Sequence, residues 1–155
     1  MALLGAWAYQ ALRNSGQRPQ APLGLVKPGT RREESELQRR SEVIFRAMIN
    51  AVKADGRIDE NEIDKIIGKL RESGGDAQEE RYMLTQLQKP METRDLVAEA
   101  QDQPELGVEI YAASLLAIEV DTTAERDYLK NLATDLGLTP EVTRNIENLV
   151  GLQPA

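Results

Sequence analysis

Acidic side chains gather in the stretch ADGRIDENE, residues 54–62, where they could ligate a hard cation such as Ca²⁺. From its glycine onwards the stretch matches the second half of a calcium loop, with Asp55 just before the glycine and Glu62 six residues after it. The earlier ligand positions of such a loop fall on Ala51 and Lys53, a methyl group and a cation, which cannot coordinate a metal ion. The sequence therefore disfavours an EF-hand, and any ion bound here would need carboxylates from elsewhere in the chain.

A second acidic turn follows sixty-six residues later, in an internal repeat. The apolar pattern of residues 44–55 recurs without a gap in residues 110–121, and both copies end in an aspartate, Asp55 and Asp121. The sequence therefore predicts two helix–acidic turn–helix units. If the units pack about a pseudo-twofold axis, their acidic turns lie at the same end of the bundle.

Helix capping explains part of this acidity without any ion. Asp59 with Glu62, and Thr122 with Glu125, match the capping box. In that motif the N-cap side chain and the glutamate three residues later each accept a hydrogen bond from a backbone N–H, and such a cap is worth about 1 kcal/mol. Three of the acidic residues are accounted for in this way.

Capping does not explain Asp55 and Asp121. Each is expected at the carboxyl end of a helix, where the macrodipole disfavours negative charge by about 0.3–1 kcal/mol. A cation shared between the two turns would offset this cost and the repulsion between the carboxylates. Cation binding, and capping with solvation, therefore both stay open.

The absence of two residue types narrows the possible chemistry. The chain has no cysteine and no histidine, which excludes Ser-His-Asp and Cys-His catalysis, disulfides and the usual zinc or copper sites. Oxygen ligands remain, and they suit Ca²⁺, Mg²⁺ or Mn²⁺. A hydrolase with a carboxylate-bound metal is the rival, but no glycine-rich loop or arginine cluster is present to hold a phosphate. We expect no enzyme, no catalytic residue and no cofactor other than a divalent cation.

Packed helices must position these turns. Aromatic residues make up only 4% of the chain, so the core depends on Leu, Ile, Val, Ala and Met, and no segment alternates as a strand would. Apolar residues at helical spacing predict an all-α, compact bundle of about seven helices. The predicted helices cover residues 33–52, 63–70, 76–89, 93–101, 104–118, 124–136 and 140–150.

The chain before this bundle divides into two parts. Residues 1–13 form an apolar, amphipathic segment that is too short to span a bilayer, and residues 14–32 form a Pro- and Gly-rich basic linker. The predicted helical domain then spans residues 33–155. Three roles stay open for the apolar segment: lying on a membrane surface, docking on a partner or on the chain's own body, and ending a longer hydrophobic segment.

Charge is divided unevenly between these parts. Residues 1–32 carry a net charge of +5 and the remainder carries −12, which leaves the chain at −7. The basic residues of this arm are Arg13, Arg18, Lys27, Arg31 and Arg32. An acidic body argues against nucleic acid as the partner, because phosphate binding needs a cationic face. The arm can bind an anionic membrane, at about 1 kcal/mol per basic residue, or it can simply keep the linker soluble.

Two stretches, AMINAVKADGRIDENE (residues 47–62) and IYAASLLAIEVDTTAERDYLKNLATDLGL (residues 110–138), resemble the TerB-like superfamily, in particular its YebE-type branch of uncharacterised bacterial inner-membrane proteins. The resemblance covers nearly all of residues 38–150 and implies a helical bundle with two quasi-repeated acidic turns. It also implies a divalent-cation site at the family's acidic positions. These fall here on Asp55, Asp59, Glu62, Asp121 and Glu125. Thr122 and Thr123 stand where a further acid is often found, which weakens the second turn as a site.

The sequence and the resemblance together lead to one preferred expectation and its rivals. We expect a non-enzymatic module, associated with the cytoplasmic side of the inner membrane through residues 1–32, that binds a divalent cation or a protein partner. The resemblance places such a module in an envelope or metal stress response, as in tellurite resistance. A protein-interaction or oligomerisation domain without metal is the alternative, and a metal-dependent hydrolase is less favoured.

Overall fold

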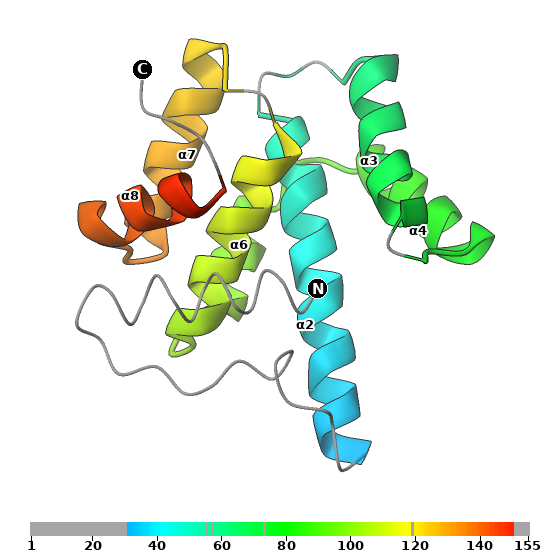
Figure 1. Ribbon diagram of the computed structural model, residues 1–155, viewed down its shortest axis with the longest axis horizontal. Coiled ribbons are helices and arrows are strands. Elements are labelled where there is room, and N and C mark those ends of the chain that lie inside the picture. Colours follow the sequence, from blue (N-terminus) through cyan, green and yellow to red (C-terminus); the bar gives the residue numbers. More distant parts are fainter. Residues whose placement is uncertain (1–30, 55, 57, 73, 119, 151–155) are drawn as a thin grey trace.

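Seven helices make up the described part of the chain in the computed structural model, which covers residues 31–54, 56, 58–72, 74–118 and 120–150. No strand occurs among these residues, so the predicted all-α bundle is confirmed (Figure 1). The helices are α2 (Arg31–Val52), α3 (Glu60–Glu72), α4 (Ala77–Leu87), α5 (Thr93–Glu99), α6 (Pro104–Ala117), α7 (Thr123–Asp135) and α8 (Pro140–Leu149).

Helices α2 and α6 pack together at the centre of the bundle and run in the same direction (Figure 1). Every residue of α6 from Leu106 to Leu115 is buried, as its nearly uniform apolar sequence predicts. In α2 the buried residues begin only at Val43, because the first half of this helix is rich in charged side chains. The central pair thus joins a fully buried helix to one that is half solvated.

The remaining helices lie on two sides of this pair. Helices α7 and α8 pack against α6, whereas α4 packs against α2. Helix α3 in turn packs against α4. Ile66, Ile67 and Leu70 form the buried face of α3, as the spacing predicts. Leu84 lies at helical spacing from other apolar residues but is 38% exposed, because Met83 and Leu87 take the inward positions of α4.

Local sequence sets the helix ends. Thr139 caps α8 by accepting a hydrogen bond from the N–H of Val142, and Pro140 occupies the first turn, as the residue types at these two positions favour. Gly137 ends the preceding segment with a positive φ of 71°, a conformation that glycine adopts without strain. Helix α2 begins at Arg31, slightly before the predicted domain boundary.

The apolar segment of residues 1–13 and almost all of the predicted linker lie outside the described residues. Within the described part, no helix is both long enough and apolar enough to cross a bilayer.

Candidate functional site

The first acidic turn lies between α2 and α3, where the capping box is present. The Asp59 N–H donates to Glu62 Oε2 at 3.0 Å, and the Glu62 N–H donates to Asp59 Oδ1 at 2.9 Å. Both carboxylates therefore stabilise the start of α3. Lys53, which interrupts the calcium-loop pattern, has a structural role: its Nζ donates to the carbonyls of Gln86 and Lys89 at the end of α4. Asp55 lies outside the described residues.

The second acidic turn lies between α6 and α7, and its glutamate, Glu125, is more deeply buried than Glu62. Glu125 is only 5% exposed, and its Oε2 accepts from the N–H groups of Asp121 and Thr122 and from the Thr122 hydroxyl at 2.8–3.2 Å. Burial acts to raise the pKa of Glu125, but the hydrogen bonds from Thr122 and Asp121 outweigh it and hold the pKa below its ordinary value. The buried side chain is therefore a carboxylate at neutral pH.

Both acidic turns lie at the same end of the α2–α6 pair, at the top of Figure 1. Among the described residues, however, no group of three or more acidic side chains is arranged to hold a metal ion. At least one carboxylate oxygen of each of three residues already accepts a hydrogen bond from a backbone N–H in a helix cap: Asp59, Glu62 and Glu125. The predicted metal site stays a prediction, because one of its five ligands, Asp55, is outside the described residues.

A larger feature is a hollow of ≈ 820 Å³ that opens between α6, α7 and α8. We call it the α6–α8 groove. The apolar residues that line it are Leu115, Val120, Leu129, Ala133, Leu138 and Pro140. Since Leu115 and Leu129 are also core residues, the floor of the groove is fixed by the packing of the bundle.

Three charged side chains line the α6–α8 groove. Glu147, from α8, accepts a hydrogen bond from the Tyr111 hydroxyl at 3.1 Å. Burial, and then the charge of Glu147, raise the pKa of Tyr111, so this hydroxyl remains a donor. Arg126 and Lys130, from α7, make no side-chain ion pair or hydrogen bond within the described part of the chain. Their charges are available to a ligand.

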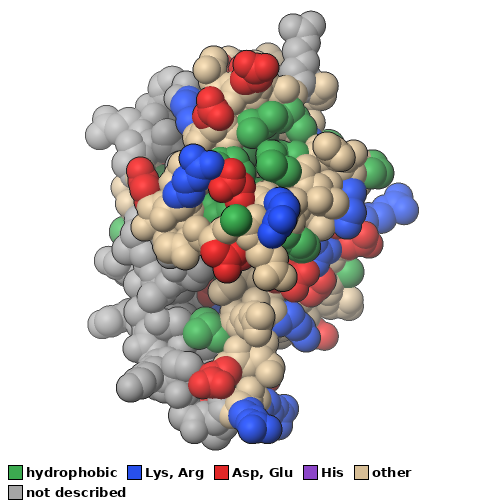
Figure 2. Space-filling view, turned by 90° about the vertical axis from the view of Figure 1, so that its right-hand side faces the viewer, with side chains coloured by type: hydrophobic (Ala, Val, Ile, Leu, Met, Phe, Trp, Pro, Cys, Tyr) green, Lys and Arg blue, Asp and Glu red, His purple; other side chains and the backbone are tan. Residues whose placement is uncertain are grey.

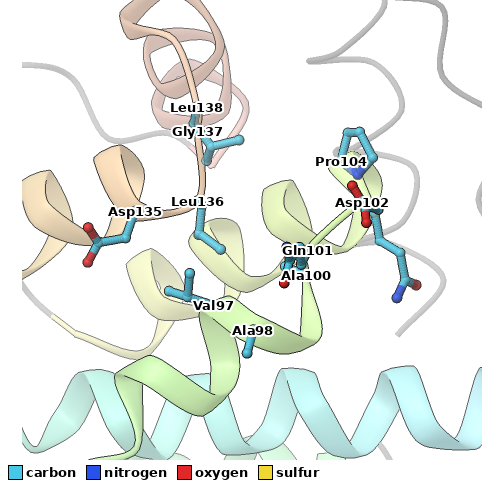
Figure 3. Close-up of a pocket in the computed structure, with 11 residues that line it drawn as sticks. Val97, Ala98, Ala100, Gln101, Asp102, Pro104, Asp135, Leu136, Gly137 and Leu138 are labelled. Carbon is cyan, nitrogen blue, oxygen red and sulfur yellow. The ribbon is translucent and has the colours of Figure 1, made fainter.

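A smaller hollow of ≈ 480 Å³ lies between the α5–α6 turn and the α7–α8 turn (Figure 3). Val97 and Leu136 point into it, while its two carboxylates, Asp102 and Asp135, lie on opposite sides. Asp102 has a positive φ of 62°, which aspartate tolerates better than most residues. Because the two carboxylates diverge, this hollow does not assemble a joint acidic site.

The interior also contains polar contacts that sequence analysis did not identify. Asn50 is 1% exposed, and its amide donates to Thr93 Oγ1 and Tyr128 OH and accepts from the Glu92 N–H. These bonds tie α2 to the start of α5 and to α7. All the buried side-chain polar atoms of the described residues have partners, so this network is structural, with no group left to act on a ligand.

The opposite face of the molecule, formed by α3 and α4, differs from the groove. Acidic and basic side chains are interspersed there with apolar ones (Figure 2). The exposed large apolar side chains of the described residues are Tyr82, Leu84 and Met91, and Tyr82 donates to Glu42 at 2.9 Å. Scattered exposed apolar side chains of this kind are ordinary on a protein surface.

The α6–α8 groove was not predictable from the sequence motifs. Only the crossing of α6, α7 and α8 leaves part of their apolar faces uncovered. The spacing of Arg126 and Lys130 was a usable indication, since residues four apart share one side of a helix. The acidic turns form the more conspicuous pattern in the sequence.

Comparison with known proteins gives a family and no activity. Residues 1–150 match the family described as "Protein of unknown function (DUF533)". A relative from Yersinia enterocolitica, named "Uncharacterized protein in ampR 5'region", is 28% identical over 121 residues, which cover 78% of this chain and 86% of the relative. No solved structure matches.

Proposed function

Because the chain belongs to the DUF533 family, whose name assigns no activity, we propose from its geometry that it is a non-enzymatic binding module that holds an apolar or amphipathic partner in the α6–α8 groove. The observation that carries this proposal is the groove itself. Its volume of ≈ 820 Å³ and its mainly apolar lining match ordinary ligand sites, which span about 300–1,000 Å³ and contain few polar groups.

Dye binding tests the proposal on the full chain. Nile red, an uncharged apolar dye, should bind with one molecule per chain and become fluorescent. Ala133→Trp places a large side chain in the groove and should abolish the signal. Ala124→Trp is the matched control, since Ala124 is exposed on the same helix and does not line the groove. Equal dye binding by both variants would remove the groove from the proposal.

A divalent cation at the acidic end is a second candidate function. Two observations favour it: both acidic turns lie at one end of the α2–α6 pair, and Asp121 is close enough to Glu125 to affect its pKa. A cation would neutralise the two adjacent carboxylates. The hydrogen bonds described above favour capping for Glu62 and Glu125, which is why this function ranks second.

Thermal unfolding tests the cation. The melting temperature is measured in chelator and then in millimolar Ca²⁺, Mg²⁺ or Mn²⁺; an ion at 100 times its dissociation constant adds about 2.7 kcal/mol of stability. Asp55→Asn and Asp121→Asn should abolish the rise. A melting temperature that no ion changes would leave the carboxylates as caps and surface charge.

Membrane association is the third part of the proposal and rests on residues 1–32. Their net charge of +5 beside an apolar segment supports binding to an anionic surface. The TerB-like resemblance supports a setting at the inner membrane and in envelope or metal stress. Sedimentation with anionic phosphatidylglycerol vesicles tests the contact, and binding that survives neutralisation of the five basic residues counts against its electrostatic origin.

A further inference from the structure

Two cations on the wall of the α6–α8 groove point to the chemistry of its ligand. Arg126 and Lys130 are four residues apart on α7, so they lie on one side of that helix. Like charges at this spacing repel each other. Both side chains are exposed, unlike the half-buried Arg40 and Arg46, which are paired with carboxylates.

Other exposed arginines, such as Arg39 and Arg94, also have no ion pair among the described residues, but they do not line the α6–α8 groove. The chain has 26 acidic and 19 basic residues, yet no carboxylate of the described residues pairs with Arg126 or Lys130. The one acid that lines the groove, Glu147, is instead bound by Tyr111. An anionic group from outside the chain would meet two cations already in place.

The apolar lining continues from these cations along the helix. From Arg126 to the end of α7 at Asp135 the groove follows the helix for nine residue steps, which corresponds to about 14 Å at 1.5 Å per residue. Leu129 and Ala133 face the groove in this interval, and Leu138 and Pro140 continue its lining beyond it. A ligand lying in the groove would therefore need an apolar part of about this length.

Helix direction orients the charges. Helix α7 runs opposite to α6 in Figure 1, so Arg126 lies toward the Leu115 end of the groove. Tyr111 precedes Leu115 by one turn of α6, and Glu147 is bonded to it. The two cations thus lie on the α7 wall near the Leu115 end of the groove, and Glu147 lies on the α8 wall, bonded one helical turn away along α6.

From this arrangement we propose that the ligand of the α6–α8 groove is a single-chain anionic amphiphile of the fatty-acid type. Its head group pairs with Arg126 and Lys130, and its chain lies along α7 toward Leu138. This inference rests on the proposed function, and it specifies the class of ligand.

Displacement of Nile red from the full chain tests the inference. The probes are dodecanoate and dodecyltrimethylammonium, which have the same chain length and opposite charges, each below its micelle concentration. Dodecanoate should displace the dye at lower concentration. The double variant Arg126→Gln with Lys130→Gln should bind dodecanoate about fivefold more weakly, because exposed ion pairs contribute modestly to affinity. The effect should shrink at high salt.

A matched control removes two other exposed arginines, with Arg81→Gln and Arg94→Gln on α4 and α5, and should leave displacement unchanged. Equal displacement by both amphiphiles, or an unaffected double glutamine variant, would overturn the inference while leaving the groove as an apolar binding site. Failure of Nile red to bind the groove would instead overturn the proposed function as well.

The chain's own apolar segment is the competing occupant, and it contains the only tryptophan, Trp7. If residues 1–13 fill the groove, dodecanoate will expel them and make Trp7 more accessible to acrylamide quenching. That result would overturn the inference of an external amphiphile. Quenching of Trp7 that dodecanoate leaves unchanged supports it.

Discussion

The two helix–turn–helix units share an apolar pattern, but the structure places them in different surroundings. In the first unit, α2 is half solvated and its acidic turn is capped by Glu62, which is only partly buried. In the second, α6 is buried over ten consecutive residues and the cap of its turn, Glu125, is 5% exposed. The same local motif is therefore a surface cap in one unit and part of the interior in the other.

This difference shows how a repeat can diverge without losing its local pattern. In the second unit α6 lies between α2 on one side and α7 and α8 on the other, whereas in the first unit the first half of α2 has no buried residue before Val43. Energetic effects of equivalent substitutions should consequently be larger in the second unit. The following predictions test that expectation, beginning with the largest effect.

The aromatic side chains at equivalent positions give the strongest contrast. Tyr111 is 4% exposed and donates to Glu147, while its counterpart Phe45 is only partly buried. Tyr111→Ala should lower the free energy of unfolding by about 3–5 kcal/mol, the usual cost of removing a buried aromatic ring. Phe45→Ala should cost clearly less. Urea unfolding measures both, and equal losses would contradict the comparison.

The two capping glutamates should differ next. Glu125→Gln weakens a buried acceptor that serves three donors, so a loss of about 1–3 kcal/mol is expected. Glu62→Gln keeps a possible cap at a more exposed site and should cost about 0.5 kcal/mol or less. The same unfolding experiment compares them; a reversed order would show that burial does not strengthen the second cap.

Two buried glutamates, Glu125 and Glu109, should change the pH dependence of stability in opposite directions. The pKa of Glu125 is lowered, so its contribution is present above the ordinary glutamate pKa and is lost as pH falls through the lowered value. Burial, opposed by Arg40, raises the pKa of Glu109, so the folded state binds its proton more readily and is destabilised as pH rises above the ordinary value.

Unfolding between pH 3 and pH 7 tests these signs. On acidification the stability difference between the native chain and Glu125→Gln should shrink. On the same acidification, the stability of the native chain should rise relative to that of Glu109→Gln. Two variants that follow parallel pH profiles would contradict the opposite signs.

The smallest expected effect concerns the aspartates of the two turns. In chelator, Asp121→Asn should be neutral or should stabilise the chain by about 0.3–1 kcal/mol, because a negative charge follows the carboxyl end of α6 and lies near Glu125. Asp55→Asn is the equivalent change in the first turn. Destabilisation by Asp121→Asn without any ion would assign this carboxylate a structural bond in place of a ligand role.

Features that depend on near neighbours in the sequence were predictable. Helix existence, the Thr139 cap and the capping boxes of both acidic turns follow from residues within four positions of one another. Leu84 shows where prediction from neighbouring residues fails. Its position on the helical stripe was compatible with burial, and only the rotation of α4 against α2 decided that it is exposed.

The site features were harder to foresee because their parts come from distant positions. The α6–α8 groove joins Tyr111 to Glu147, and the Asn50 network joins α2 to Tyr128, seventy-eight residues away. Periodicity shows that a face is apolar, but it does not show which neighbour covers that face. The acidic turns drew attention because their residues are adjacent, while the groove has no compact motif.

By itself, the sequence determined that this protein is helical, repeats one helix–turn–helix unit and has no cysteine or histidine for catalysis. Local hydrogen bonding and helical periodicity are encoded over a few residues, so these properties need no knowledge of long-range contacts. The tertiary structure alone decided that Glu125 is buried, that α2, α7 and α8 surround α6, and that α6, α7 and α8 leave an apolar groove beside Arg126 and Lys130. These properties depend on how helices cross, and the crossing is set by the packing of the whole core.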